Sequence, residues 1–188
     1  MVHGTRAHAE SLWDRVGEVL ARVGLRLAPE KTRVSHIDEG FDFLGFRIRR
    51  HRQRGGDRTL IYTYPSPRSM ATIKRKVKQA TTRITHHSAD RLFLQVGRQI
   101  RGWAQYFRHS SASGAYHDLQ HFLWWRVWHW LRNKHPRTGK RWIVQRYYDG
   151  WCPEYNGVRL FQPTTMTITR YRYRGANIPS PWGKPLPA

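Results

Sequence analysis

This 188-residue sequence is poor in cysteine, in long apolar runs and in acidic residues. Cys152 is the single cysteine, which excludes a disulfide framework within the chain and a zinc site built on paired cysteines. No apolar run approaches the roughly 18–20 residues of a membrane-spanning helix, and no secretory signal pattern opens the chain. We therefore expect a reducing compartment that contains nucleic acid, the bacterial cytoplasm, and no membrane partner.

The shortage of acidic residues leaves a large positive charge. Twelve Asp and Glu stand against 34 Lys and Arg, for a formal net charge of +22. Such a chain repels itself unless a polyanion neutralises it. Arginine outnumbers lysine by 27 to 7, and its planar guanidinium both pairs with phosphate and stacks on bases. Residues 1–42 have a net charge of −1 and residues 43–188 one of +23, so an ordinary segment precedes a nucleic-acid-binding one.

Aromatic side chains are abundant, with nine Trp, nine Tyr and seven Phe, which favours a folded chain over a disordered one. In the first part, hydrophobic periodicity and turn residues predict a mixture of helix and strand. The expected elements are a helix at 8–23 capped by Gly24, strands at 33–37 and 41–49, a turn at 55–57 and a strand at 59–64. Phe41, Phe43 and Leu44 are expected to pack inward from the second strand.

Pro65-Ser66-Pro67 interrupts the pattern and marks the best candidate for a domain boundary. Beyond it the apolar spacing is mainly helical. The expected elements are helices at 69–85, 90–108, 115–134 and 142–148, then short strands at 158–161 and 166–173. The last residues, 176–188, are rich in proline and predict an extended tail.

Basic residues cluster on two of these elements, and we expect them to contact phosphate rather than only solvent. The hairpin carries Arg47, Arg49, Arg50 and Arg52, and the helix after the boundary carries Lys74, Arg75, Lys78 and Arg83. Farther on, bases alternate with aromatic residues, a pattern typical of surfaces that combine phosphate contact with base stacking. These later candidates are Arg101, Arg108, Arg126, Arg132, Lys134 and Arg141.

No combination of residues predicts a catalytic or metal centre. His117 and His121 have a spacing that suits a metal, but the segment between them supplies no glutamate, and eleven histidines make such a pair expected by chance. Asp38, Glu39 and Asp42 are close in sequence, yet a turn explains them better than two-metal chemistry does. We expect no cofactor bound by this chain and no enzyme activity from it alone.

Several segments resemble the C-terminal part of group II intron-encoded reverse transcriptase/maturases. The segments at 25–32 and 40–46 look like the end of the reverse-transcriptase palm, and Gly-Phe-Asp-Phe-Leu-Gly-Phe at 40–46 is the most specific of them. Residues 67–87 resemble the start of the thumb. Residues 100–107 and 128–135 resemble the maturase-specific domain, called domain X.

The resemblance implies an α+β fold in four parts. These are a helix and β-hairpin remnant of the palm at 1–64, a thumb-like helix at 65–88, a mainly helical domain X at 89–175 with an irregular C-terminal extension, and the tail at 176–188. In this family a Tyr-Ala-Asp-Asp motif supplies catalytic carboxylates, and it would precede Met1, so no catalytic residue carries over to this chain.

What the resemblance implies instead is a maturase role: the protein stabilises folded intron RNA for splicing, and Mg²⁺ belongs to that RNA or to a full-length polymerase. Three alternatives stay open. The chain could be half of a split RNA-directed DNA polymerase that needs an upstream fragment, a truncated remnant without function, or a DNA-binding module of a mobile element.

Overall fold

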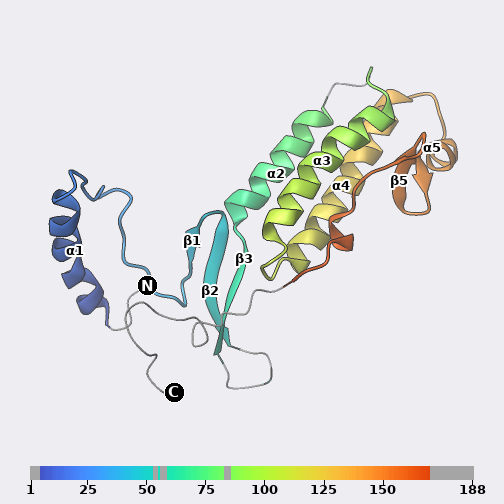
Figure 1. Cartoon of the computed structure of the whole chain (residues 1–188). Helices are drawn as coiled ribbons and strands as arrows, with labels where there is room; N and C mark the ends of the chain where they lie inside the picture. Colours follow the sequence, from blue (N-terminus) through green and yellow to red (C-terminus); the bar gives the residue numbers. More distant parts are fainter. Residues whose placement is uncertain (1–4, 53–54, 56–58, 83–85, 170–188) are drawn as a thin grey trace. The chain divides into compact units, whose positions relative to one another are not determined.

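The computed structural model describes residues 5–52, 55, 59–82 and 86–169 (Figure 1). Within this range it is a mixed α+β structure with five helices, one short 3₁₀ turn and two small antiparallel sheets of three strands each. The chain divides into two compact units, residues 1–62 and residues 63–188.

Unit 1 begins with helix α1 (Arg6–Ala21), close to the helix expected at 8–23. Thr5 caps its first turn, because the hydroxyl accepts a hydrogen bond from the His8 N–H at 3.3 Å. Gly24 ends it as expected: its N–H donates to the Ala21 carbonyl at 3.0 Å, and Leu25 N–H reaches back to Leu20 at 3.0 Å.

The segment at 33–37 was expected to be a strand, and that prediction is wrong. Residues 33–36 are irregular and Ile37 lies in a turn. One backbone bond, from Arg50 N–H to the Ile37 carbonyl at 3.0 Å, ties this segment to the hairpin. A β-strand needs a series of backbone hydrogen bonds to a neighbouring strand, and this segment has one. Its β-branched residues are therefore not enough to form a strand here.

The expected strand at 41–49 is two strands, β1 (Phe41–Phe43) and β2 (Phe46–Arg52), paired antiparallel with Phe43 opposite Phe46. The two-residue turn between them has φ of 48° at Leu44 and 80° at Gly45, the left-handed pair that tight hairpins require. As a result Phe43 and Leu44 are 58% and 69% exposed, so the expectation that they pack inward is also wrong.

The backbone requires a glycine at position 40, directly before this hairpin. Its φ is 76°, and a Cβ at this position would lie 2.9 Å from the Ile48 carbonyl oxygen. Strand β3 (Thr59–Pro65), expected at 59–64, lies next to β2, so the sheet order is β1-β2-β3. The turn expected at 55–57 lies largely outside the described residues.

Unit 2 is built on three helices that Figure 1 shows side by side: α2 (Pro67–Ala80), α3 (Ala89–Phe107) and α4 (Ser113–Lys134). All three were predicted within a few residues, except that α2 ends at Ala80 instead of 85. The Thr81 hydroxyl turns back to donate to the Val77 carbonyl at 2.8 Å as the helix closes.

After α4 come the short helix α5 (Lys140–Tyr147) and a small sheet of order β4-β5-β6, made of β4 (Tyr148–Asp149), β5 (Cys152–Tyr155) and β6 (Val158–Arg159). A 3₁₀ turn follows at Pro163–Thr165. The strand expected at 166–173 is absent from the described part, since 166–169 are irregular, and the rest of it and the tail lie outside that part.

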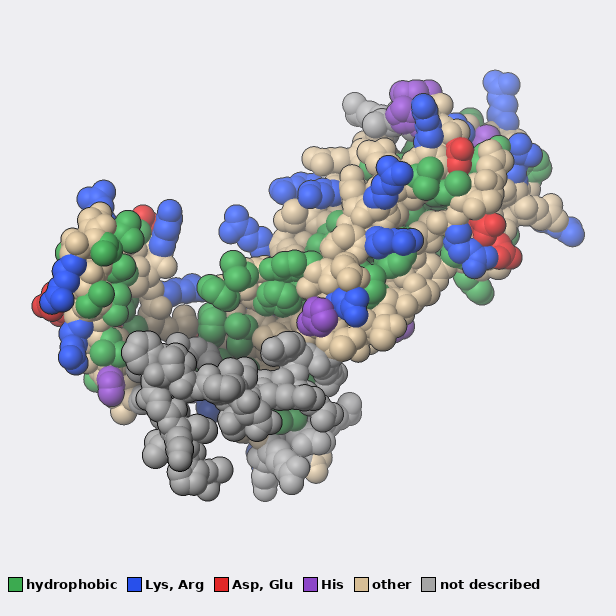
Figure 2. All heavy atoms as spheres, viewed as in Figure 1, with side chains coloured by type: hydrophobic (Ala, Val, Ile, Leu, Met, Phe, Trp, Pro, Cys, Tyr) green, Lys and Arg blue, Asp and Glu red, His purple; other side chains and the backbone are tan. Residues whose placement is uncertain are grey.

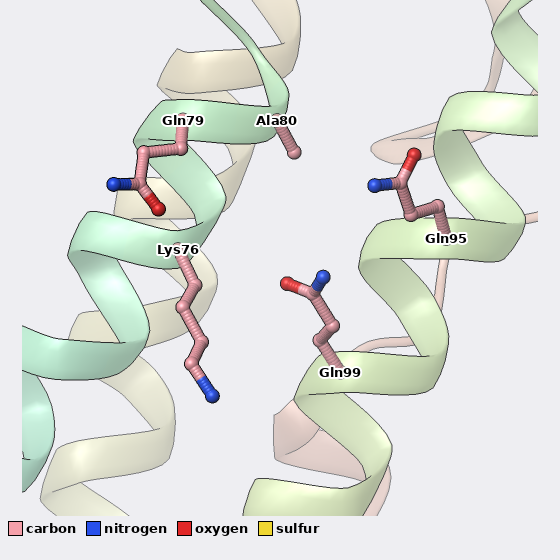
Figure 3. Close-up of a pocket in the computed structure, with 5 residues that line it drawn as sticks. All are labelled: Lys76, Gln79, Ala80, Gln95 and Gln99. Carbon is pink, nitrogen blue, oxygen red and sulfur yellow. The ribbon is translucent and has the colours of Figure 1, made fainter.

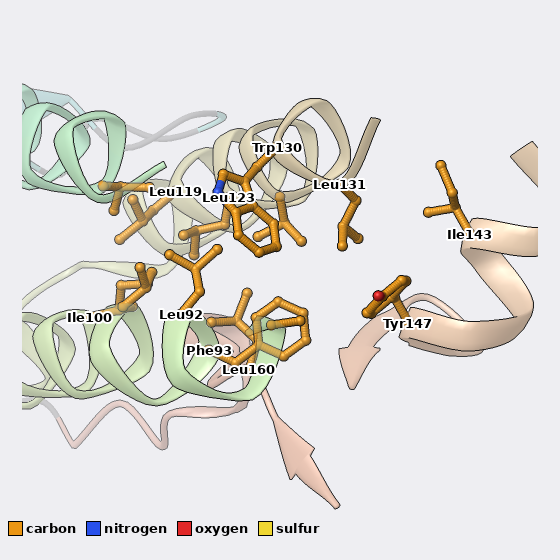
Figure 4. Packing of buried hydrophobic residues seen from close by; sticks show 14 of the residues in the cluster. Leu92, Phe93, Ile100, Leu119, Leu123, Trp130, Leu131, Ile143, Tyr147 and Leu160 are labelled. Atoms are coloured by element: carbon orange, nitrogen blue, oxygen red, sulfur yellow. The ribbon is translucent and has the colours of Figure 1, made fainter. Parts of the chain in front are cut away.

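The hydrophobic core lies in unit 2, where α3 and α4 face each other (Figure 4). Phe93 and Ile100 of α3 meet Leu123 and Trp130 of α4, all 1% exposed or less. Hydrogen bonds add to this packing: Tyr116 OH of α4 donates to the Ala104 carbonyl of α3 at 2.6 Å, and Trp103 Nε1 of α3 donates to Ser69 Oγ of α2 at 3.1 Å. Burying each large apolar side chain contributes about 1.5–3 kcal/mol, so this cluster dominates the stability of the unit.

Candidate nucleic-acid interface

Few acidic side chains oppose the bases of unit 2, and most of those described are already engaged. Asp118 pairs with Lys74 at 2.7 Å, and Asp149 and Glu154 both pair with Arg159. Asp90 stands at the start of α3, where a hydrogen bond from Ser88 is the main cause that lowers the pKa of its carboxyl. Most Lys and Arg side chains of this unit therefore have no carboxylate partner. Figure 2 shows many Lys and Arg side chains and few acidic ones on the visible face of its helices.

Four of the candidate bases in unit 2 make contacts within the protein. Lys74 joins α2 to Asp118 of α4, and Lys134 donates to the His87 carbonyl at 2.8 Å. The Arg101 guanidinium lies over the Phe161 ring, 4.9 Å from its centroid. Arg126 donates from Nε to Thr81 Oγ1 at 2.9 Å, and so links α4 to the end of α2.

Arg108 lies at the C-terminal end of α3 and is half-buried. Its carbonyl accepts from Thr169 N–H at 3.0 Å, while its Nε is shielded from solvent without a hydrogen-bond partner among the described residues. An unpaired buried donor costs about 1–3 kcal/mol, which an incoming acceptor such as phosphate would offset if the side chain turned outward.

The remaining candidates in this unit project into solvent. Arg75 and Lys78 stand one turn apart on α2, Arg132 lies in the last turn of α4, and Arg141 in the first turn of α5. All four are exposed, and none of their side chains forms an ion pair or hydrogen bond with another described residue. They are the bases most available to an external polyanion. Arg83 lies outside the described residues.

The hairpin bases of unit 1 differ, because the neighbouring turn supplies acceptors. Arg47 pairs with Asp42 at 3.2 Å, and Arg49 Nε donates to the Asp38 carbonyl at 2.8 Å. Arg50 pairs with the Asp38 carboxylate, with Nη2 2.7 Å from Oδ2, and this contact lowers the pKa of that carboxyl. Arg52 is exposed at the end of β2. These acids hold the hairpin and its turn together, in agreement with a structural role for them.

An aromatic cluster lies on the outer side of α4. The Trp124 and Trp128 rings are stacked with centroids 5.8 Å apart, and Tyr148 and Trp151 pack around Trp124. Trp151 stands in the turn between β4 and β5 and is 82% exposed. We did not expect Trp151 as a surface residue, although Asp149-Gly150-Trp151 is a recognisable turn sequence.

The described residues contain no group of three or more His, Cys, Asp or Glu side chains that could hold a metal. His121 is engaged elsewhere, because Trp125 Nε1 donates to its Nε2 at 3.0 Å. In the same part of the chain, no helix combines the length and the apolar character that a membrane span requires.

Met70 to Tyr148, from α2 through α5, match a family described as "Group II intron, maturase-specific domain". This segment is a group II intron maturase-specific domain. The match confirms the resemblance to the maturase-specific domain, and the palm-like segments at 25–32 and 40–46 lie outside the matched residues. The match also includes most of the helix that the resemblance assigned to the thumb, and no reverse-transcriptase catalytic domain was identified.

The chain is also similar to the protein YkfC of Escherichia coli strain K12, with 36% identity over 70 residues. That match covers 37% of this chain and 18% of YkfC, so the chain aligns with a small part of the relative's length. The maturase-specific domain thus coincides with the helices that carry the core and most of the exposed bases.

Proposed function

We propose that this protein binds structured RNA, in particular group II intron RNA, and stabilises its folded form for splicing. The observation that carries the proposal is a maturase-specific domain whose exposed bases have almost no carboxylates to pair with. When RNA helices pack together, their phosphates come close and repel one another. Lys and Arg side chains on a protein surface reduce that repulsion. The splicing chemistry and its Mg²⁺ would belong to the RNA.

Within this proposal the candidate bases have two roles. Arg75, Lys78, Arg132 and Arg141 are free to contact phosphate directly. The other group stabilises the folded surface through contacts within the protein and adds positive charge to it. Its members are Lys74, Arg101, Arg126 and Lys134. Arg108 would turn outward, and Arg47, Arg49, Arg50, Arg52 and Arg83 would extend the footprint.

The domain division stays part of the proposal. We assign residues 1–64 to the end of a palm, 65–88 to a thumb-like helix, 89–175 to domain X with an irregular C-terminal extension and 176–188 to a tail. The hairpin geometry supports the first assignment, because the glycines of the block at 40–46 are required by positive φ values and not by composition alone.

The test is equilibrium binding across a salt series to three ligands: a folded group II intron RNA, an unrelated structured RNA and duplex DNA. We expect the intron RNA to bind about a hundredfold more tightly, with a ratio that persists as salt rises. Equal affinities that fall together with salt would mean that the chain is only a polycation, and would contradict the proposal.

A charge-matched pair of variants locates the interface. Changing Arg75, Lys78 and Arg132 to glutamine should reduce the slope of log affinity against log salt by about three, since each phosphate contact contributes about one. The control changes Arg6 and Arg15 of α1, and Arg22 directly after it, to glutamine, which removes the same charge elsewhere. Equal loss in both variants would show that net charge, rather than this surface, determines binding.

A second candidate is half of a split RNA-directed DNA polymerase, and α1 favours it. This helix has no buried residue, and it leaves Trp13, Val16 and Val19 between 40% and 62% exposed. An apolar helix face of this kind suits a protein partner. Co-expression with a polypeptide that carries a reverse-transcriptase palm should then give a co-purifying complex, and Val16→Glu should disrupt it while RNA binding persists.

A further inference from the structure

A groove lies between α2 and α3, on a different part of the surface from the apolar contacts that hold these helices together. It is lined by Lys76, Gln79 and Ala80 from α2 and by Gln95 and Gln99 from α3 (Figure 3). Its volume is about 380 Å³, at the lower end of the roughly 300–1,000 Å³ typical of small-ligand sites.

Primary amides form most of the lining of the groove. Three glutamines and one ammonium group surround it, and no carboxylate contributes. Figure 3 shows Gln95 and Gln99 pointing from α3 toward α2, where the small side chain of Ala80 leaves room. The buried contacts of Ile73 and Val77 already hold α2 in place, so packing does not require the amides.

One of these amides has unused hydrogen-bonding capacity. The Gln99 Oε1 atom is shielded from solvent and has no hydrogen-bond partner among the described residues. A shielded acceptor without a partner is unfavourable, and a ligand that donates a hydrogen bond to it removes that cost once the Gln99 amide turns into the groove. The groove therefore favours a ligand with a donor next to an acceptor, because a glutamine amide presents both groups side by side.

We propose that this groove binds one unpaired adenine nucleotide of the RNA. Adenine offers its N6 amino group to the amide oxygen and its N7 to the amide N–H, the pairing that glutamine makes with this base. Lys76 lies beside the amides and would hold the flanking phosphate. The proposal rests on the proposed RNA binding and adds to it a base preference, since unpaired bases are where proteins read RNA sequence.

The experiment compares two fluorescent RNA oligonucleotides of eight adenosines, one of them with 7-deazaadenine at every position. The 7-deaza base keeps its stacking surface and its amino group but lacks the N7 acceptor. With the full chain at one fixed salt concentration, fluorescence anisotropy should show about fivefold to tenfold weaker binding of the 7-deaza oligonucleotide. The Gln95→Leu/Gln99→Leu variant should bind both oligonucleotides alike.

Two controls keep the result specific. Gln105→Leu changes an exposed glutamine of α3 that does not line the groove, and it should retain the preference. Lys76→Gln should weaken both oligonucleotides equally and lower the salt slope by about one. Far-UV circular dichroism must show the same helix content in each variant.

Two outcomes would overturn the proposal. One is equal affinity of the unaltered chain for both oligonucleotides, and the other is a preference that survives the double glutamine variant. Neither of them affects the salt-dependent binding of intron RNA, so failure of the groove and failure of the proposed function are distinguishable.

Discussion

The two units of this protein hold their structure by different means. Every buried hydrophobic side chain among the described residues lies in unit 2, whereas α1 of unit 1 has no buried residue. Unit 1 depends instead on local features: a capping threonine, left-handed turns, and ion pairs such as Arg50 with Asp38. Exposed ion pairs contribute little to stability, so unit 1 is expected to be the weaker of the two.

The two units also differ in how they use charge. In unit 1 the acids around Asp38 neutralise the hairpin arginines, while in unit 2 Arg75, Lys78 and Arg132 lie exposed without a carboxylate. The better-packed unit is therefore the one with free positive charge. The helical core is stable enough to hold like-charged Lys and Arg side chains close together on its surface. A polyanion that binds there meets basic side chains that are already in place.

The largest expected effect tests the difference in packing. Leu123→Ala removes a side chain that is 1% exposed between α3 and α4, and should lower the free energy of unfolding by about 3–4 kcal/mol. Val19→Ala on α1, at a position 62% exposed, should change it by less than about 0.5 kcal/mol. Urea denaturation followed by circular dichroism measures both. Similar losses in the two variants would mean that α1 is as well packed as α4.

The next prediction concerns two tyrosines of unit 2 whose hydroxyl groups are buried but differ in hydrogen bonding. Burial raises the pKa of Tyr116 to about 12, and its hydroxyl donates to the Ala104 carbonyl. Tyr116→Phe should cost about 1–2 kcal/mol, because that bond is lost. The Tyr148 hydroxyl is buried without a partner among the described residues, so Tyr148→Phe should be neutral or stabilising. Equal destabilisation by both changes would contradict this distinction.

A smaller effect separates structural arginines from free ones. Arg126→Gln removes the hydrogen bonds from α4 to Thr81 and Thr82 and should cost about 1 kcal/mol of stability. Arg132→Gln should leave stability nearly unchanged but reduce the salt slope of RNA binding by about one. Thermal denaturation and an anisotropy salt series on both variants check the assignment, and a larger stability loss at Arg132 would reverse it.

The smallest effect is on pH dependence. Burial, with Lys134 and Arg146 nearby, lowers the pKa of His135 below its usual 6.5. The unfolded chain therefore binds this proton more readily, so the contribution of neutral His135 is present above about pH 6.5 and is lost as pH falls below it. His135→Gln should flatten the stability profile below about pH 6.5. A profile that stays unchanged in the variant would assign the acid sensitivity to other groups.

The helices of unit 2 were predictable because their periodicity is repeated and unambiguous. Leu92, Val96 and Ile100 recur at helical spacing, and all three are buried in α3. The group II intron resemblance was also readable from the sequence. The sequence did not predict where α2 ends. The end depends on the hydrogen bond from the Thr81 hydroxyl to the Val77 carbonyl and on the hydrogen bond that Thr81 accepts from Arg126.

The errors lie in unit 1, where tertiary pairing decides the structure. Residues 33–37 have strand-forming side chains but only one backbone bond to the hairpin. The hairpin at Leu44-Gly45 was missed because leucine is a poor signal for positive φ. Among the candidate bases, the sequence could not distinguish Arg126, which is engaged inside the protein, from Arg132, which is not, since both are arginines on one helix.

The single cysteine has a practical consequence. Cys152 is buried in β5, 6% exposed, and burial raises the pKa of its thiol, so it is unreactive while the small sheet stays closed. A thiol reagent can modify it only after this part of unit 2 opens. With no other sulfhydryl in the chain, the labelling rate reads the opening equilibrium at one known position. The labelling rate of Cys152 therefore reports how readily this part of unit 2 opens, and a ligand that stabilises the closed form should slow it.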